Sequence, residues 1–207
     1  PTMHFINGQA GTSDPLTGIL TAMSNNPEAA LGFLEPGGGT ADDAARVEGL
    51  MKRGELGDNS WTDIWAGLAE RASASHAAEY APDAGSGSAG AKGAAALSAS
   101  VVNTIGAATT EVSEAARGDL TRVVAAYPWS VDQAARTDGA SHEPVIMPGG
   151  TDGQGAETWC HGMSYQPQFT GRGLSGVMQA ISRDTGDFQT VADSVAAVEQ
   201  RRMTFEA

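Results

Sequence analysis

Apolar side chains recur at intervals of three and four residues along most of this 207-residue chain. That spacing places them on one face of an α-helix, whereas a β-strand needs strict alternation. Much of the apolar content is alanine, which has the highest helix propensity, and aromatic residues make up only 6% of the chain. The pattern therefore predicts an all-α domain of about seven to nine closely packed helices.

Helix start signals support this division. In "NNPEAALGFL", Asn26 can cap a helix that starts at Pro27, where the missing N–H of proline costs nothing. The stretch "SDPLTGILTAMSN" repeats the device at Pro15. We expect further helices over residues 40–54 and 59–80, two between 94 and 127, a short one from 128, and two between 167 and 207. Phe188, Val191 and Val198 are expected to face inward from the last helix.

Two segments lack the helical spacing. Residues from about 82 to 93 are small and polar, which predicts a flexible loop. Residues from about 137 to 166 are rich in Gly, Pro and Asp and predict one long irregular loop, which in a compact domain is usually functional or disordered. We expect residues 1–207 to form a single domain. Because the chain starts at Pro1 and stops within a helical pattern, we also expect it to be a fragment of a longer chain.

The two ends of the chain carry a similar pattern. Setting "LTGILTAMSNNPEAALGFL" above "LSGVMQAISRDTGDFQTVA" aligns Leu16 with Leu174 and Gly18 with Gly176 at a constant offset. Each copy predicts a short helix, a polar corner and a second helix. The hypothesis is a duplicated helical hairpin, and its alternative is chance similarity between two amphipathic helices. A repeat of this kind concerns packing rather than catalysis.

The charge balance excludes some functions. The chain has 25 acidic and 12 basic residues, a net charge of -13. Such a surface repels the phosphates of nucleic acids, so no nucleic-acid partner is expected. No apolar run approaches the roughly 18 residues of a membrane span, so none is expected either.

The stretch "ETWCHGMSY" is the candidate for catalysis. A cysteine enzyme needs a thiolate with an imidazole within hydrogen-bond reach. Cys160 is the only cysteine, and His161 follows it, but neighbouring residues of an extended loop point to opposite sides. His142 or His76 would therefore serve better as the base. The carboxylates in the same loop that could orient this base are Glu143, Asp152 and Glu157.

Packing is the alternative interpretation of this loop, and the one that we favour. A free cysteine is commonly a small buried hydrophobe, so Trp159, Cys160 and Met163 can hold the loop on the helices. The loop contains no CxxC or HxxxH spacing, so no metal site is expected. The glycine-rich stretches lack the Lys-Ser/Thr ending of a phosphate loop, and no cofactor is expected.

Trp61 and Trp65 are the candidates for binding a partner, because tryptophan is favoured at protein interfaces. They share one helical face with Ile64 and Leu68, a spacing that is also typical of core residues. The core alternative is the favoured one.

Five stretches, which in order cover most of the chain, resemble an actinobacterial helical domain of unknown function. They are "DPLTGILTAMSNNPEAALGFL", "WTDIWAGLAERASA", "AAALSASVVNTIG", "RGDLTRVVAAY" and "LSGVMQAISRDTGDFQTVADSVAAVEQ". That domain occurs in large proteins with an N-terminal WXG-type module linked to type VII secretion. The resemblance implies a secreted or cell-surface-associated protein, with no catalytic residues to carry over. This chain lacks the WXG-type module, and residues 137–166 have no counterpart in the pattern.

The leading hypothesis is a non-enzymatic interaction or assembly module of a larger, exported bacterial protein, which binds a protein partner or self-associates. One alternative is a hydrolase or transferase that uses Cys160, and a second is part of an interbacterial toxin. A cytoplasmic location is the alternative to export. An enzyme needs Cys160 at a concave, reachable position beside an imidazole, whereas a scaffold should expose an apolar patch.

Overall fold

The computed structural model describes residues 15–34, 36, 41–53, 59–80, 87–108, 111–136, 145–146 and 165–205. Within these ranges the α-helices are α1 (Pro15–Ser24), α2 (Pro27–Leu34), α3 (Ala41–Arg53), α4 (Asn59–Ser75), α5 (Ala89–Ala108), α6 (Glu114–Ala126), α7 (Pro128–Arg136), α8 (Gly171–Ile181) and α9 (Thr185–Phe205). A 3-10 turn, η1 (Ala77–Glu79), follows α4, and two short strands are β1 (Val145–Ile146) and β2 (Tyr165–Gln166). The prediction of an all-α domain with seven to nine helices is confirmed.

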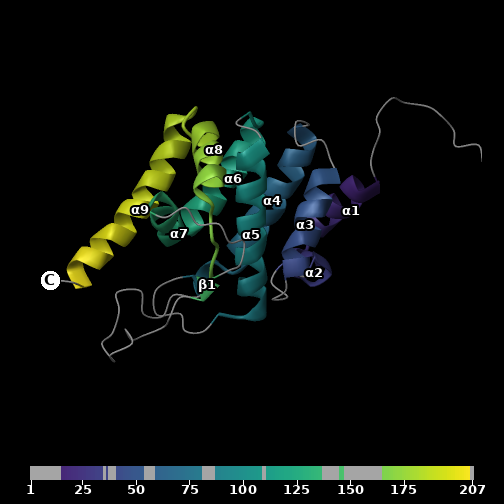
Figure 1. Ribbon diagram of the computed structural model, residues 1–207, viewed down its shortest axis with the longest axis horizontal. Coiled ribbons are helices and arrows are strands. Elements are labelled where there is room, and N and C mark those ends of the chain that lie inside the picture. The colour runs from purple at the N-terminus through teal and green to yellow at the C-terminus, as the bar shows by residue number, and fades with distance from the viewer. Residues whose placement is uncertain are drawn as a thin grey trace, which may run out of the picture.

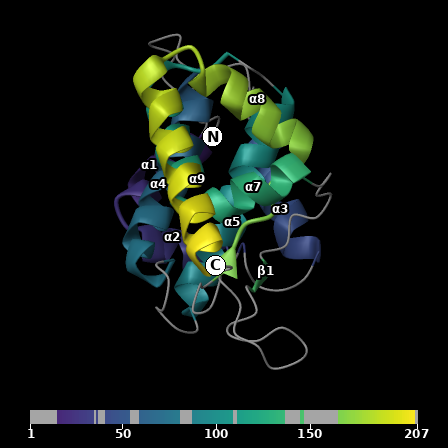
Figure 2. The same ribbon diagram turned by 90° about the vertical axis from the view of Figure 1, so that its left-hand side faces the viewer.

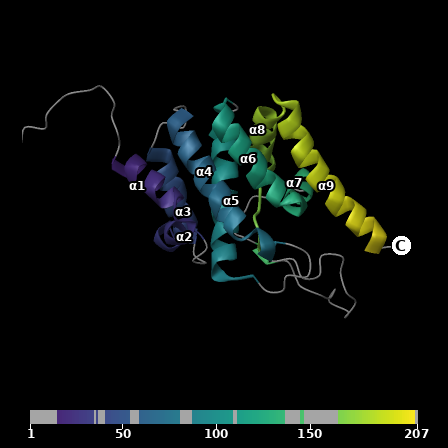
Figure 3. The same ribbon diagram turned by 180° about the vertical axis from the view of Figure 1, so that it is seen from behind.

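Helix α5 is the centre of the fold. Helices α1–α4 lie on one side of it and α6–α9 on the other, as opposite views show (Figures 1 and 3). Seen from the side of α9, that helix lies in front, with α7 and α8 beside it (Figure 2). Every residue of α5 from Gly93 to Gly106 is buried. A helix that is buried on all sides must present small or apolar side chains all round, and this stretch is mostly Ala, Gly, Ser and Val.

The predicted inward faces are largely found. The buried side chains include Leu97, Val101, Ile105, Leu120, Val124, Leu174 and Val191. Asn26 caps α2 as predicted, because its side chain accepts a hydrogen bond from the N–H of Ala29 (3.2 Å).

The inward prediction for Phe188 is wrong, since 45% of this residue is exposed. The cause is local. The carboxylate of Asp187 accepts a hydrogen bond from the Arg117 guanidinium on α6 (2.8 Å). Because Asp187 is turned towards α6, the next residue along the helix, about 100° further round, faces solvent.

The two predicted loops are shorter than expected. Residues 89–93 belong to α5, because Ser88 Oγ accepts a hydrogen bond from the N–H of Ala91 (3.1 Å) and starts the helix there. The segment 137–166 is not irregular throughout, since β1 and β2 pair antiparallel with Val145 opposite Gln166. β-branched and aromatic residues favour such pairing. Residues 81–86, 137–144 and 147–164 lie outside the described residues.

The order of elements at the two ends agrees with the duplicated-hairpin hypothesis, but their surroundings differ. Both ends form a helix, a corner and a second helix, α1–α2 and α8–α9. The aligned positions nevertheless have different surroundings, since Ile19 is 49% exposed and its counterpart Val177 is 2% exposed. Helix α1 packs on α4, whereas α8 packs on α5. The same sequence pattern is therefore found in two helices that pack differently, and the duplication stays a prediction.

Glycines make the crossing of α5 and α8 unusually close. A Cβ built on Gly176 would lie 2.7 Å from the carbonyl carbon of Gly106 and nearer still to its oxygen. A Cβ on Gly173 would lie 2.5 Å from the Cα of Asn103. The Asn103 side chain accepts a hydrogen bond from the N–H of Thr170 (2.7 Å) at the start of α8. The two backbones are therefore in direct contact at this crossing.

Candidate functional site

The residues of the cysteine-enzyme alternative lie outside the described part of the chain. They are Cys160, His161 and His142, with the possible orienting groups Glu143, Asp152 and Glu157. The catalytic alternative therefore stays a prediction. His76, which was considered as a base for Cys160, lies within the described residues.

Trp61 and Trp65 lie in the core, where the favoured alternative expected them. They are 4% and 0% exposed, and their rings meet edge to face with centroids 6.0 Å apart. The Trp61 indole N–H donates to the carbonyl of Met51 (2.8 Å), which joins α4 to α3. Neither side chain presents an aromatic surface to solvent, and no binding role is assigned to them.

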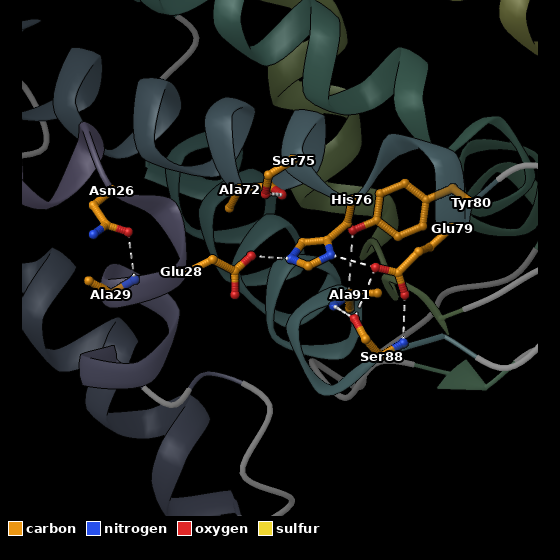
Figure 4. Close-up of polar contacts among 10 residues, drawn as sticks. All are labelled: Asn26, Glu28, Ala29, Ala72, Ser75, His76, Glu79, Tyr80, Ser88 and Ala91. Atoms are coloured by element: carbon orange, nitrogen blue, oxygen red, sulfur yellow. Dashed lines mark hydrogen bonds and ion pairs between the residues drawn. The ribbon is translucent and has the colours of Figure 1, made fainter.

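His76 is the centre of a polar cluster between α2, η1 and α5 (Figure 4). Its side chain is 9% exposed, with Nδ1 2.7 Å from Glu79 Oε1 and Nε2 2.8 Å from Glu28 Oε1. The second contact is close but out of line, so Nε2 has no aligned hydrogen-bond partner. A Cβ on Gly90 would lie 2.6 Å from Nε2, so only glycine leaves room for the ring. Both ring nitrogens face carboxylates of this cluster, which makes His76 a structural group here.

The Glu79 carboxylate contacts Ser88 as well as His76. It accepts hydrogen bonds from the backbone N–H of Ser88 (2.6 Å) and from the Ser88 hydroxyl (2.9 Å). The Ser88 N–H and the His76 ring hold the pKa of Glu79 below its ordinary value. Because the serine hydroxyl donates to the carboxylate and not to the imidazole, the cluster is not a nucleophile and base pair. It ties η1 to the start of α5.

The lowered pKa of Glu79 predicts a pH effect on stability. A carboxylate whose pKa is lower in the folded state stabilises it above the unfolded-state value of about 4.3, and that contribution is lost as the pH falls through the folded-state pKa. We expect Glu79→Gln to be less stable than wild type at about pH 7, with the difference shrinking at about pH 3. Urea unfolding at both pH values measures this. A difference that is the same at both would contradict the assignment.

The outer surface of the α1–α2 hairpin carries little charge and exposes two large apolar side chains. Glu28 is the single charged residue between Pro15 and Leu34. Phe33 is 61% exposed and Ile19 49% exposed. The other exposed residues described in the hairpin are Gly18, Thr21, Ala22, Asn25, Asn26, Glu28, Ala29 and Gly32. In a chain of net charge -13, this face stands apart from the rest of the surface.

A cavity of about 610 Å³ lies between η1, the α6–α7 junction, β2 and α9. Ala126 and Trp129 form one wall, and Ala197 and Val198 of α9 form another. Burial raises the pKa of Tyr80, which also lines the cavity, so its phenol stays neutral. No local sequence pattern predicts this cavity, because its walls come from five separate elements.

Neither a metal site nor a membrane-spanning helix is present in the part of the chain that the structure describes. Among the described residues, no group of three or more His, Cys, Asp or Glu side chains is arranged to hold a metal ion. Within the same part of the chain, every helix is too short or too polar to cross a lipid bilayer.

The helices define an all-α multi-helix domain. A family model matches residues 4–207, and the chain belongs to that family, DUF6571, a family of unknown function. Neither the curated proteins nor the solved structures contain a match. The predicted resemblance to a helical family of unknown function is confirmed in this form. The actinobacterial origin and the WXG-type association are not part of what the family model shows.

Proposed function

We propose that the chain is a non-enzymatic interaction and assembly module of a larger, exported bacterial protein. The outer surface of the α1–α2 hairpin carries this proposal. Large exposed apolar side chains on a charge-poor face are typical of protein interfaces, whose cores are depleted of charge and enriched in aromatic residues. Phe33, at 61% exposed, is the most exposed aromatic residue of this face.

The chemistry of the face favours a second copy of this chain as the partner. Two chains of net charge -13 repel each other over most of their surface. The α1–α2 face contributes only Glu28 to that repulsion, so the electrostatic repulsion between two copies is smallest there. Buried apolar surface then favours association.

The proposal of export rests on the sequence resemblance. The stretches quoted from the sequence resemble an actinobacterial domain that occurs with WXG-type modules of type VII secretion, which supports a secreted or cell-surface location. In such a protein, a module without catalytic residues would hold chains or domains together.

The test is self-association of the wild-type chain and of Phe33→Asp. A charge in place of this exposed aromatic ring should weaken association at least tenfold, which corresponds to about 1.4 kcal/mol. Sedimentation velocity over a range of protein concentrations measures the dissociation constant. Phe33 is largely exposed, so the variant should keep its circular dichroism spectrum and stability.

Met203→Asp is the matched control. Met203 is 60% exposed, nearly as much as Phe33, but lies on α9. It should leave association within about twofold of wild type. A chain that stays monomeric at every concentration, or equal effects of the two variants, would overturn the proposal.

A further inference from the structure

We infer that the cavity beside α9 is a binding site for an apolar small molecule that carries an anionic group. The site is separate from the α1–α2 face and does not depend on the function proposed for that face. Its volume of about 610 Å³ is within the range of roughly 300 to 1,000 Å³ that is typical of small-molecule sites. Residues of five elements, η1, α6, α7, β2 and α9, line it.

The lining explains the apolar part of the ligand. Small side chains form most of the walls, among them Ala125, Ala126 and Ala197. Their size is what leaves the space open between α6 and α9. Trp129, at the start of α7, is partly exposed and offers an aromatic ring beside this space. Planar apolar molecules pack well against such a ring.

The charges at the cavity explain the anionic part. Arg201 is a lining residue, and none of the described residues that line the cavity is Asp or Glu. That is unusual for a chain with 25 acidic and 12 basic residues. A guanidinium binds carboxylate, sulfonate or phosphate groups through paired hydrogen bonds. Gln166 and Ser194 add neutral hydrogen-bonding groups to the lining.

The volume of the cavity and its surroundings favour a small molecule over a segment of a partner protein. A stable protein interface buries about 800 Å² on each partner, which needs a broad surface around the pocket. Here charged groups flank the cavity, since the Arg136 side chain on nearby α7 pairs with Glu199 of α9 (3.4 Å). Mainly apolar cavities of this volume with a few polar groups are typical of small-molecule sites.

Two fluorescent probes of nearly the same shape test both parts of the inference. The anionic probe is 8-anilinonaphthalene-1-sulfonate, and the neutral probe is N-phenyl-1-naphthylamine, which lacks the sulfonate. We expect both to bind the folded chain at one site, with enhanced emission. Arg201→Gln should weaken binding of the sulfonate at least tenfold and leave binding of the neutral probe within twofold. Arg201 also makes an interaction within the chain, and the neutral probe controls for its loss.

A second pair of variants locates the site. Ala197→Trp should fill the cavity and weaken binding of both probes at least tenfold. Ala196→Trp is the matched control, because Ala196 is the preceding exposed residue of α9 and does not line the cavity. It should leave both affinities within twofold. Circular dichroism checks that each variant is folded, since the sulfonate probe also binds partly unfolded states.

Three results would overturn the inference. If neither probe binds the folded wild type, the cavity takes no small apolar molecule, and a protein segment becomes the better occupant. If Ala196→Trp weakens binding as much as Ala197→Trp, the probes bind elsewhere. If Arg201→Gln changes the affinities for both probes equally, the ligand needs no anionic group.

Discussion

Replacing Gly176 with alanine is expected to lower the free energy of unfolding by about 3 kcal/mol, at the upper end of what overpacking usually costs. The added Cβ would fall within 2.7 Å of the carbonyl carbon of Gly106, so α5 and α8 would have to separate. Both atoms in conflict belong to helix backbone or are fixed to it, and no side chain can rotate away. Urea unfolding followed by circular dichroism measures the loss.

Gly18→Ala is the matched control for this prediction. The sequence pattern aligns Gly18 with Gly176, and both lie within a helix. A Cβ on Gly18 would meet nothing within 4 Å. Alanine is favoured over glycine in a helix by up to about 1 kcal/mol, so this variant should be as stable as wild type or more stable. Equal losses in the two variants would contradict the close crossing of α5 and α8.

Trp65→Ala is expected to destabilise the chain by about 3 to 5 kcal/mol, the range for removing a large aromatic side chain from a core. Trp65 is 0% exposed and packs against Trp61. The variant leaves a large cavity between α4 and its neighbours, which the surrounding helices can fill only in part. Thermal or urea unfolding should show the loss, and the folded fraction at 37 °C should fall.

Trp129→Ala separates this core role from a surface role. Trp129 is partly exposed at the cavity beside α9, so its removal should cost much less stability, about 1 kcal/mol. If instead Trp65→Ala stayed as stable as wild type and lost self-association, the result would support the alternative in which Trp61 and Trp65 bind a partner.

Much of the fold is readable from the sequence because its signals are local. Helix spacing, the Asn26 cap and the proline at position 27 depend on residues within one or two turns of each other. The error at Phe188 has a non-local cause, since Arg117 on α6 sets the rotation of the first turn of α9. The contrast between Gly18 and Gly176 is non-local too, because the two glycines look alike in sequence and differ only in what packs against them.

The candidate sites also divide into those with a local sequence signal and those without one. The apolar α1–α2 face is visible in the sequence as a stretch in which Glu28 is the single charge. The pairing of His76 with Glu79 has a local signal, since residues three apart share a helical face. The contact of His76 with Glu28, and the cavity formed by η1, α6–α7, β2 and α9, depend on how distant elements meet. No spacing rule in one sequence contains that information.

The central position of α5 has a consequence for how the chain comes apart. A helix that is enclosed from Gly93 to Gly106 loses most of its stability when the helices on either side detach, because helices in proteins are stabilised mainly by packing. Neither helices α1–α4 alone nor helices α6–α9 alone can keep α5 folded. The backbone amides of α5 should therefore exchange with deuterium only when the whole domain opens.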